Sequence, residues 1–122
     1  MPRTTKILIA SFVAALAIAG QASAHAHLTS SVPADKATVQ VSPVAVELHF
    51  SEELNLRFSS ATIAGAGDKQ IKTGDAKLSD DGKTLTIPVP ESLDAGGYVV
   101  EWHVLSTDGH KTNGSYGFTV KP

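Results

Sequence analysis

The stretch that decides the fold is Tyr98-Val99-Val100-Glu101-Trp102-His103-Val104-Leu105-Ser106. Its bulkiest apolar side chains recur at every second position, at Tyr98, Val100, Trp102 and Val104, with Val99, Glu101, His103 and Leu105 between them. A period of two is typical of a β-strand with one buried face. Because aromatic rings bury a large apolar area, the face with the tyrosine and tryptophan is predicted to face the core.

A second stretch, Val44–Phe50, shows the same alternation, with its valines, leucine and phenylalanine on one face and Glu47 and His49 on the other. We therefore expect His49 and His103 to be ordinary residues of the sheet surface. Further strands are predicted at Leu28–Val32, at Phe58–Ala64, at Ala76–Leu78, at Thr84–Ile87, in the segment that carries Tyr116, Phe118 and Val120, and, with a weaker pattern, at Gln70–Lys72.

The connections favour antiparallel pairing. Asp80-Asp81-Gly82-Lys83 lies between two apolar runs and predicts a hairpin turn. Pro88 and Pro90 cannot donate to a strand ladder, so the preceding strand should end there or lie at a sheet edge. About seven short strands without helical periodicity predict an all-β protein, an antiparallel β-sandwich of immunoglobulin-like architecture.

The first 24 residues have the pattern of a cleaved signal peptide. Arg3 and Lys6 precede an apolar run, residues 7–20, and Ala22 and Ala24 are the small residues read at an A-x-A cleavage site. The alternative, a membrane anchor, needs a longer apolar span. Cleavage after Ala24 would leave residues 25–122 as one exported domain that is not inserted in the membrane.

Composition limits the partners and the metal chemistry. The signal peptide removes Arg3 and Lys6, so the mature chain keeps eight basic against twelve acidic residues, a net charge of −4. That balance argues against a nucleic acid partner, which would select a basic face. There is no cysteine, and the one methionine is Met1. Any metal site of the mature chain must therefore use nitrogen and oxygen ligands, which suit Cu(II) and related divalent ions.

Cleavage would make His25 the first residue, and an N-terminal histidine can hold one metal through its α-amine and its ring together. The amine titrates near 7.7–8.0, so its lone pair is available close to neutral pH. Asp108 and His110 stand two positions apart in a predicted loop, Thr107–Asn113, and residues at that spacing point the same way in an extended segment. If the fold brings the chain start to this loop, these residues supply three nitrogens and one oxygen, a tetragonal set that Cu(II) prefers.

Simpler interpretations remain open for each candidate. His25 could be part of a disordered terminus, Asp108 a turn former, and His110 a surface loop residue. His27 could be a ligand or an ordinary polar residue at a strand start. A histidine in third position also allows a chelate of amine, two amides and imidazole, which any flexible peptide could form.

Over the whole mature chain the sequence resembles the periplasmic copper-resistance protein C family, which includes CopC, PcoC and YobA-like proteins. The resemblance rests on His25-Ala26-His27-Leu28 with Ser30-Ser31-Val32-Pro33-Ala34, on Glu47-Leu48-His49-Phe50-Ser51-Glu52, on Ala95-Gly96-Gly97-Tyr98-Val99-Val100-Glu101-Trp102, and on Val104-Leu105-Ser106-Thr107-Asp108-Gly109-His110 with Gly114 and Phe118-Thr119-Val120. It implies a cupredoxin- or immunoglobulin-like β-sandwich over residues 25–122 that binds copper in the periplasm. The implied ligands are His25, Asp108 and His110, with His27 as a further ligand or close neighbour.

One departure from the family bears on function. Some members also hold Cu(I) in a methionine-rich loop, but residues 56–77 contain no methionine. We expect one Cu(II) site per mature chain and no Cu(I) site. The resemblance implies a copper carrier or buffer that serves copper resistance or homeostasis, with an inner-membrane transporter of the CopD type as its partner.

The sequence allows two other functions. A copper-dependent oxidative enzyme of the lytic monooxygenase type also holds copper through an N-terminal histidine, but this chain is short for that class and Asp108 would disfavour reduction of the metal. A metal-free adhesive sandwich domain is the third. We expect a binding protein, not an enzyme.

Overall fold

The computed structural model describes residues 25–122, and the predicted signal peptide, residues 1–24, lies outside them. The strands are β1 (Leu28–Val32), β2 (Thr38–Val39), β3 (Ala45–Phe50), β4 (Ser60–Ala64), β5 (Lys77–Leu78), β6 (Thr84–Pro88), β7 (Gly96–Leu105) and β8 (Lys111–Val120). Two short 3-10 helices, η2 (Leu56–Phe58) and η3 (Ala66–Asp68), flank β4. Within residues 25–122 no helix is long and apolar enough to cross a membrane.

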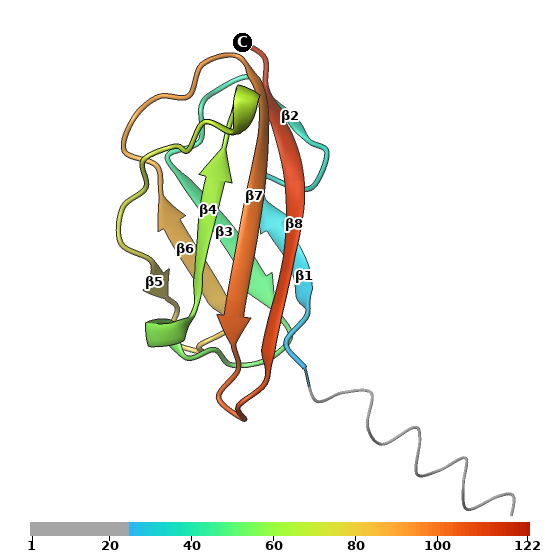
Figure 1. The fold of residues 1–122 in the computed structure, drawn as a ribbon, viewed down its shortest axis with the longest axis vertical. Helices are drawn as coiled ribbons and strands as arrows, with labels where there is room; N and C mark the ends of the chain where they lie inside the picture. Colours follow the sequence, from blue (N-terminus) through green and yellow to red (C-terminus); the bar gives the residue numbers. More distant parts are fainter. Residues whose placement is uncertain (1–24) are drawn as a thin grey trace, which may run out of the picture.

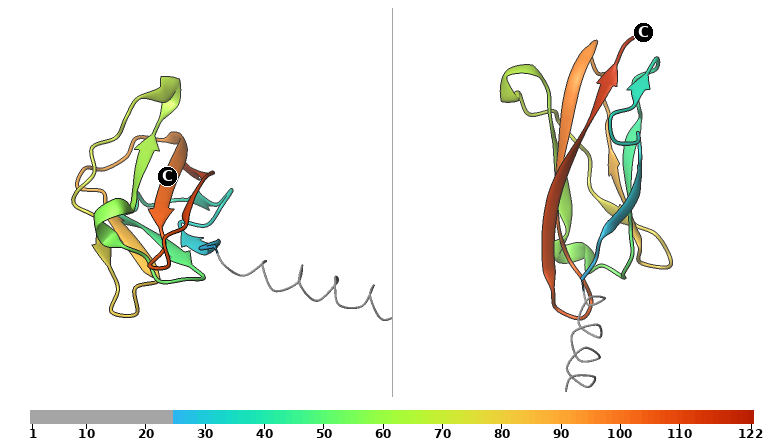
Figure 2. Two further views of the ribbon diagram at one scale, coloured as in Figure 1. Left: turned by 60° about the horizontal axis from the view of Figure 1, so that its bottom comes forward. Right: turned by 90° about the vertical axis from the view of Figure 1, so that its right-hand side faces the viewer.

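Two four-stranded sheets face each other, so the predicted all-β sandwich is confirmed (Figures 1 and 2). One sheet has the strand order β1-β3-β6-β5 and the other β2-β8-β7-β4. Every pair is antiparallel except β2 with β8, where Thr38 is opposite Thr119 in a parallel register. This pairing was not predicted, because a strand of two residues is too short to show an alternating pattern.

The core lies between the sheets and contains the predicted face of β7, with Val100 at 0% and Trp102 at 9% exposure. Val46, Leu48 and Phe50, on the inner face of β3, belong to the same core. The ring of Phe50 lies edge-on to that of Trp102, with centroids 5.1 Å apart, an arrangement that aromatic pairs prefer. These contacts join the two sheets near the end of β7 that leads into β8.

Two predicted strands begin later than expected. The backbone bends at Val44, directly after Pro43, so its side chain leaves the inner face of β3 and is exposed. Phe58 closes η2 and is exposed, and β4 begins at Ser60. Here the Asn55 side chain accepts a hydrogen bond from the amide of Arg57. Such a local turn competes with strand formation.

The last predicted loop is shorter than expected, because β8 begins at Lys111 and pairs with β7 from its first residue. Its first half lacks apolar alternation, and Gly114 stands opposite Trp102 with no side chain to oppose the indole. The connection between these two longest strands is thus reduced to residues 106–110.

The two prolines and the hairpin behave largely as predicted. β6 ends at Pro88 and lies between β3 and β5, so the proline marks a strand end and not a sheet edge. The turn at Asp81-Gly82 joins β5 to β6, and the amide of Gly82 donates to the carbonyl of Ser79 over 2.9 Å. Residues 70–72 form only an isolated bridge, between Gln70 and Ala64.

Candidate metal site

The β7–β8 connection is a tight loop closed by its own backbone. The amide of Ser106 donates to the carbonyl of His110 over 2.9 Å, and the amide of Gly109 donates back to the carbonyl of Ser106 over 2.9 Å. Gly109 has φ +92°, a conformation that residues with a side chain rarely adopt. The loop therefore presents Asp108 and His110 from a rigid base at the end of the sandwich.

Within this loop the two predicted ligands are already in contact. His110 Nδ1 lies 3.0 Å from Asp108 Oδ1, and both side chains are about half exposed, at 45% and 52%. A hydrogen bond from the Ser106 hydroxyl, followed by the contact with His110, holds the pKa of Asp108 below its ordinary value of 3.8. An ionised carboxylate can only accept hydrogen bonds, so Nδ1 must carry the ring proton.

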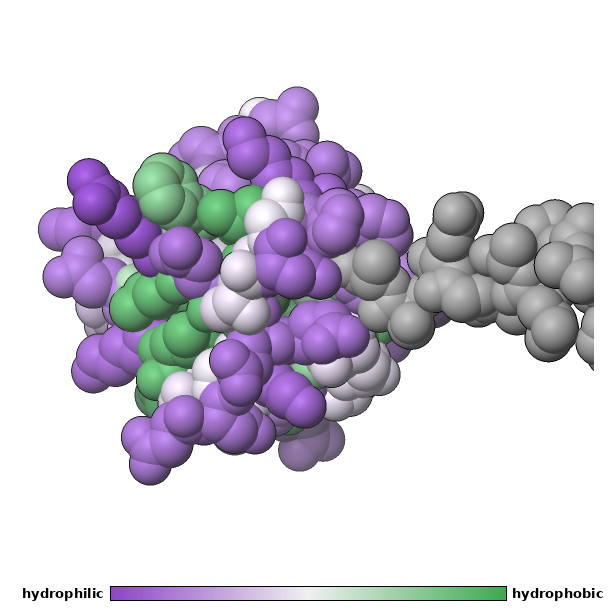
Figure 3. Space-filling model, turned by 90° about the horizontal axis from the view of Figure 1, so that it is seen from below, coloured by the Kyte–Doolittle hydropathy of each residue, from purple (hydrophilic) through white to green (hydrophobic). Residues whose placement is uncertain are grey.

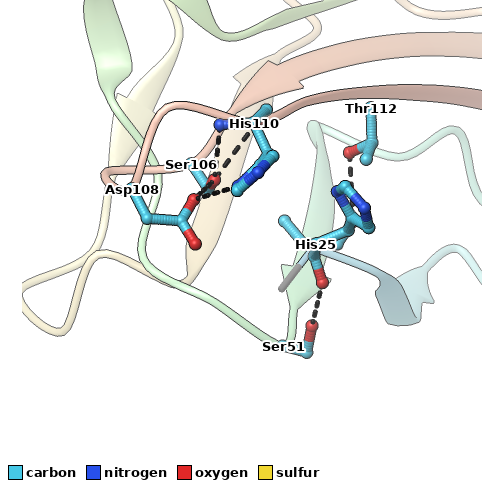
Figure 4. A network of polar contacts seen from close by, with 7 residues as sticks. His25, Ser51, Ser106, Asp108, His110 and Thr112 are labelled. Atoms are coloured by element: carbon cyan, nitrogen blue, oxygen red, sulfur yellow. Dashed lines mark hydrogen bonds and ion pairs between the residues drawn. The ribbon is translucent and has the colours of Figure 1, made fainter. Parts of the chain in front are cut away.

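The start of the described chain is fastened beside this loop (Figure 4). Ala26 is buried in the core at 1% exposure, and its carbonyl accepts a 3.0 Å hydrogen bond from the Thr112 hydroxyl. On its other side Ser51 pairs with His27: the His27 amide donates to Ser51 Oγ over 2.9 Å, and the Ser51 amide donates to the His27 carbonyl over 2.9 Å. Contacts with both sheets hold this segment, so it is an ordered part of the sandwich.

As a result the ring of His25 lies against the ring of His110. Their centroids are 4.8 Å apart and their planes are nearly perpendicular, at 82°. Figure 4 shows His25 on one side of His110 and Asp108 on the other. The fold thus places His110 in contact with both His25, at the start of the described residues, and Asp108, in the β7–β8 connection.

His27 is placed differently. Its side chain is exposed, and within residues 25–122 its ring makes no hydrogen bond, ion pair or aromatic contact. Its backbone N–H and C=O are both occupied by Ser51. Its role as a ligand stays a prediction.

Within residues 25–122 no three histidine, cysteine, aspartate or glutamate side chains are grouped so that they could hold one metal ion. His110 contacts His25 and Asp108 as two separate pairs. The predicted set also includes one group that is not a side chain. In the full-length chain the nitrogen of His25 is a peptide amide joined to Ala24, and an amide N–H is a donor without the amine's free lone pair. The fourth group of the predicted set exists only once the chain begins at His25.

Three residues that position the site were not among the predicted site residues: Ser51, Ser106 and Thr112. Serine and threonine are common on strands and turns, and nothing in their spacing singles them out. The other two histidines lie on the sheet surfaces as predicted. His49 Nδ1 is 3.0 Å from the Thr84 hydroxyl, and His103 Nε2 is 2.9 Å from that of Ser60.

The model of the CopC domain matches residues 28–121. The chain belongs to the CopC family. Protein YobA of Escherichia coli K12 is 50% identical over 99 residues, which cover 80% of each chain.

Solved structures of the family have the same fold as this CopC-family chain. The crystal structure of CopC from Methylosinus trichosporium OB3b matches with 38% identity and a TM-score of 0.75, covering 80% of this chain and 95% of that one. PcoC from Escherichia coli, described as a methionine-rich copper resistance protein, matches with 36% identity and a TM-score of 0.73, covering 80% of this chain and all of that one. The predicted family and sandwich fold are confirmed.

Proposed function

We propose that this CopC-family protein is a periplasmic Cu(II)-binding protein that carries or buffers one copper ion per mature chain. The ligands are the α-amine and ring of His25, the Asp108 carboxylate and the His110 ring, with His27 as a further ligand or close neighbour. The observation that carries the proposal is the contact of the His25 and His110 rings, 4.8 Å between centroids, beside the carboxylate of Asp108.

The distance between the rings suits a shared metal. Two imidazoles whose nitrogens lie about 2.0–2.1 Å from one ion have centroids roughly 4.5–6.5 Å apart, depending on the angle at the metal. Nitrogen ligands with one carboxylate oxygen suit Cu(II), which also heads the affinity order of the divalent first-row metals. Asp108 and His110 share one ion only when the hydrogen bond between them opens, because a carboxylate bonded to Nδ1 lies on the far side of the ring from a metal on Nε2.

The structure favours this set over the chelate of a flexible peptide. That chelate needs the deprotonated amide nitrogens of residues two and three, here Ala26 and His27. The His27 amide donates to Ser51, and the side chain of Ala26 is buried in the core. Wrapping these amides around copper would pull the segment off the sandwich.

The comparison with PcoC bears on the oxidation state of the bound copper. PcoC is described as methionine-rich, whereas this chain has Met1 alone, inside the proposed signal peptide. Cu(I) prefers soft thioether and thiolate ligands, so a mature chain without sulfur has none to offer. We propose a single Cu(II) site and no Cu(I) site, with a membrane copper transporter of the CopD type as the receiving partner.

We propose a binding protein and not an enzyme, because an anionic equatorial ligand such as Asp108 stabilises Cu(II) against the reduction that oxygen activation requires. Copper-loaded protein should consume no more oxygen with ascorbate and a polysaccharide than free copper does. Copper-dependent oxidised sugar products would support the enzyme instead.

The experiment that tests the site compares Cu(II) titrations of three proteins: the chain that begins at His25, the same chain with one extra residue ahead of it, and His110→Ala. We expect saturation at one copper in the first, and a weaker complex with a different visible spectrum in the other two. An unchanged spectrum in the extended chain would refute the amine ligand. Saturation at two coppers would refute the single site.

A further inference from the structure

A shallow hollow lies beside the candidate metal site, between η2 and the adjacent ends of β7 and β8. Its volume is about 440 Å³, at the small end of the range for ligand pockets, so it has room for a few side chains and not for a large ligand. Lys111, the residue after His110, lines it, and so does Thr112, whose hydroxyl holds Ala26. The hollow and the candidate site therefore share one stretch of β8.

The hollow carries positive charge that its own wall does not offset. Arg57 and Lys111 line it and are both exposed, and within residues 25–122 no aspartate or glutamate belongs to its wall. The hollow at the other end of β7 differs, because Lys69 and Lys72 are accompanied there by an aspartate and a glutamate. Residues 25–122 carry eight basic against twelve acidic residues, so the first hollow is a local positive region, which suits a negatively charged partner.

An exposed aromatic side chain lies beside these charges. Phe58 is 56% exposed and lines the hollow, and the guanidinium carbon of Arg57 lies 5.7 Å from the centre of its ring. Leu56, in the same 3-10 helix, is 41% exposed, and Figure 3 shows apolar side chains gathered among polar ones at this end of the molecule. Arginine and aromatic residues are enriched among those that carry the binding energy of protein interfaces.

The segment that carries η2 is held against β7, so the wall of the hollow is formed before a partner arrives. The Asn55 amide donates to the carbonyl of Leu105 over 2.8 Å, and the buried Ser59 hydroxyl accepts a 3.1 Å hydrogen bond from the amide of Leu105. Where β4 begins, the Ser60 hydroxyl lies 2.9 Å from His103 Nε2. A wall that is already ordered reduces the entropy that binding has to overcome.

We propose that this hollow docks an acidic segment of the protein that receives copper from this chain. A carboxylate of the segment pairs with Arg57 and Lys111, and an apolar side chain packs on Phe58. The role of the partner as copper acceptor rests on the proposed function, whereas binding in the hollow needs no metal. Docking there brings the acceptor next to His110.

A narrow protein segment fits this surface better than an anionic membrane does. Glu101, two residues before His103, lines the next hollow along β7. Asp108 is half exposed in the loop beyond Lys111. A flat negative surface would meet these carboxylates as well as the two cations, and like charges repel each other. A segment a few residues wide avoids them.

The test uses the metal-free chain that begins at His25 and, as the probe, a short synthetic peptide of glutamate, leucine and glycine. Titration followed by nitrogen-15 NMR should give saturable shifts of the amides of residues 57–60 and 111–113, and added salt should weaken the binding. A peptide with lysine in place of glutamate should give no saturable shift. Shifts confined to other residues would overturn the proposal. The same result would follow if these amides shifted only with phosphatidylserine vesicles, which would indicate a lipid surface.

Two double variants that lose the same charge distinguish this hollow from a general effect of net charge. Arg57→Gln with Lys111→Gln should bind the peptide about 10-fold more weakly than wild type. Lys69→Gln with Lys72→Gln, in the hollow that contains its own carboxylates, should bind it like wild type. All four side chains are exposed, so both variants should fold. Equal weakening in the two variants would refute the docking site.

Cu(II) titration keeps the two proposals apart. Arg57→Gln with Lys111→Gln should bind Cu(II) like wild type, because neither residue is a proposed ligand. If wild type binds Cu(II) but not the acidic peptide, the docking site is refuted and the proposed function stands. If the peptide binds in the hollow and wild type binds no Cu(II), the hollow still docks an acidic segment. The proposed function is then refuted, together with the role of the partner as copper acceptor.

Discussion

The hydroxyl of Thr112 donates a 3.0 Å hydrogen bond to the carbonyl of Ala26, which lies 86 residues earlier in the sequence. Thr112 is the second residue of β8, directly after the loop that carries His110. This contact ties the chain start to the strand that supports the loop, so it determines whether the two histidine rings meet.

Thr112→Val is predicted to weaken copper binding about tenfold and to lower the free energy of unfolding by about 1–2 kcal/mol, because a half-buried carbonyl loses its donor. Cu(II) titration and urea unfolding of the metal-free protein measure the two effects. Thr29→Val is the control: Thr29 makes a similar 3.0 Å bond, to the carbonyl of His49, but does not contact the loop. Equal copper affinity in Thr112→Val and wild type would contradict the prediction.

His27→Ala is predicted to reduce Cu(II) affinity less than His110→Ala does. The His27 backbone holds its place through Ser51, and those contacts survive the loss of the ring. Competitive titration against a chelator of known affinity compares the variants. If His27→Ala lost as much affinity as His110→Ala, His27 would be a full member of the ligand set.

Gly114→Ala is predicted to destabilise the protein by about 1–3 kcal/mol, because the added Cβ would lie 2.6 Å from Cζ2 of the Trp102 indole. Gly97→Ala is the control on the neighbouring strand, where an added Cβ meets nothing within 4 Å, and it should change stability by no more than about 0.5 kcal/mol. Urea unfolding monitored by Trp102 fluorescence measures both. Comparable stability of the two variants would mean that the indole shifts freely.

The hairpin turn before β6 predicts a pH effect. Hydrogen bonds from the Ser79 hydroxyl and then from the Lys83 amide hold the pKa of Asp81 below its ordinary value of 3.8. A carboxyl whose pKa is lower in the folded than in the unfolded state stabilises the fold above its unfolded pKa and loses that effect as the pH falls through the folded value.

Asp81→Asn should therefore be less stable than wild type at neutral pH, and the difference should shrink as the pH falls below 3.8. Denaturant unfolding at several pH values measures it. Asp80→Asn, a change of the same charge at the exposed neighbouring position, is the control and should show a smaller difference. If the difference in stability between wild type and Asp81→Asn did not change with pH, the lowered pKa of Asp81 would not be its cause.

Much of the fold follows from local patterns. The alternation from Tyr98 to Val104 predicts both β7 and its buried face, and Asp81-Gly82 predicts the hairpin. β2 and the first half of β8 are not visible in the pattern, because their backbones pair with neighbours while their side chains show no apolar alternation. The exposure of Val44 depends on a bend that follows Pro43, which alternation alone does not reveal.

The chemistry of the side chains was enough to predict the site residues, but the sequence pattern was not enough to predict that they lie close together. The contact between His25 and His110 depends on the pairing of β1 with β3, on the burial of Ala26 and on the bond from Thr112, and each of these joins segments far apart in the sequence. The contact of Ser106 with Asp108 was not predicted either, because the burial of Ser106 at 2% exposure beside the loop appears only in the fold.

The burial of Ala26 has a consequence for how such a protein is produced and checked. The buried methyl group of Ala26 fixes the position of the first residues on the sandwich. A chain that begins one position before or after His25 would therefore still fold into the same sandwich. Its melting temperature and its tryptophan emission would be the same. Such molecules would be well folded but would bind copper more weakly. Intact mass would detect them and assays of folding would not, so under the proposed cleavage after Ala24 the accuracy of the peptidase sets the fraction of protein that binds copper tightly.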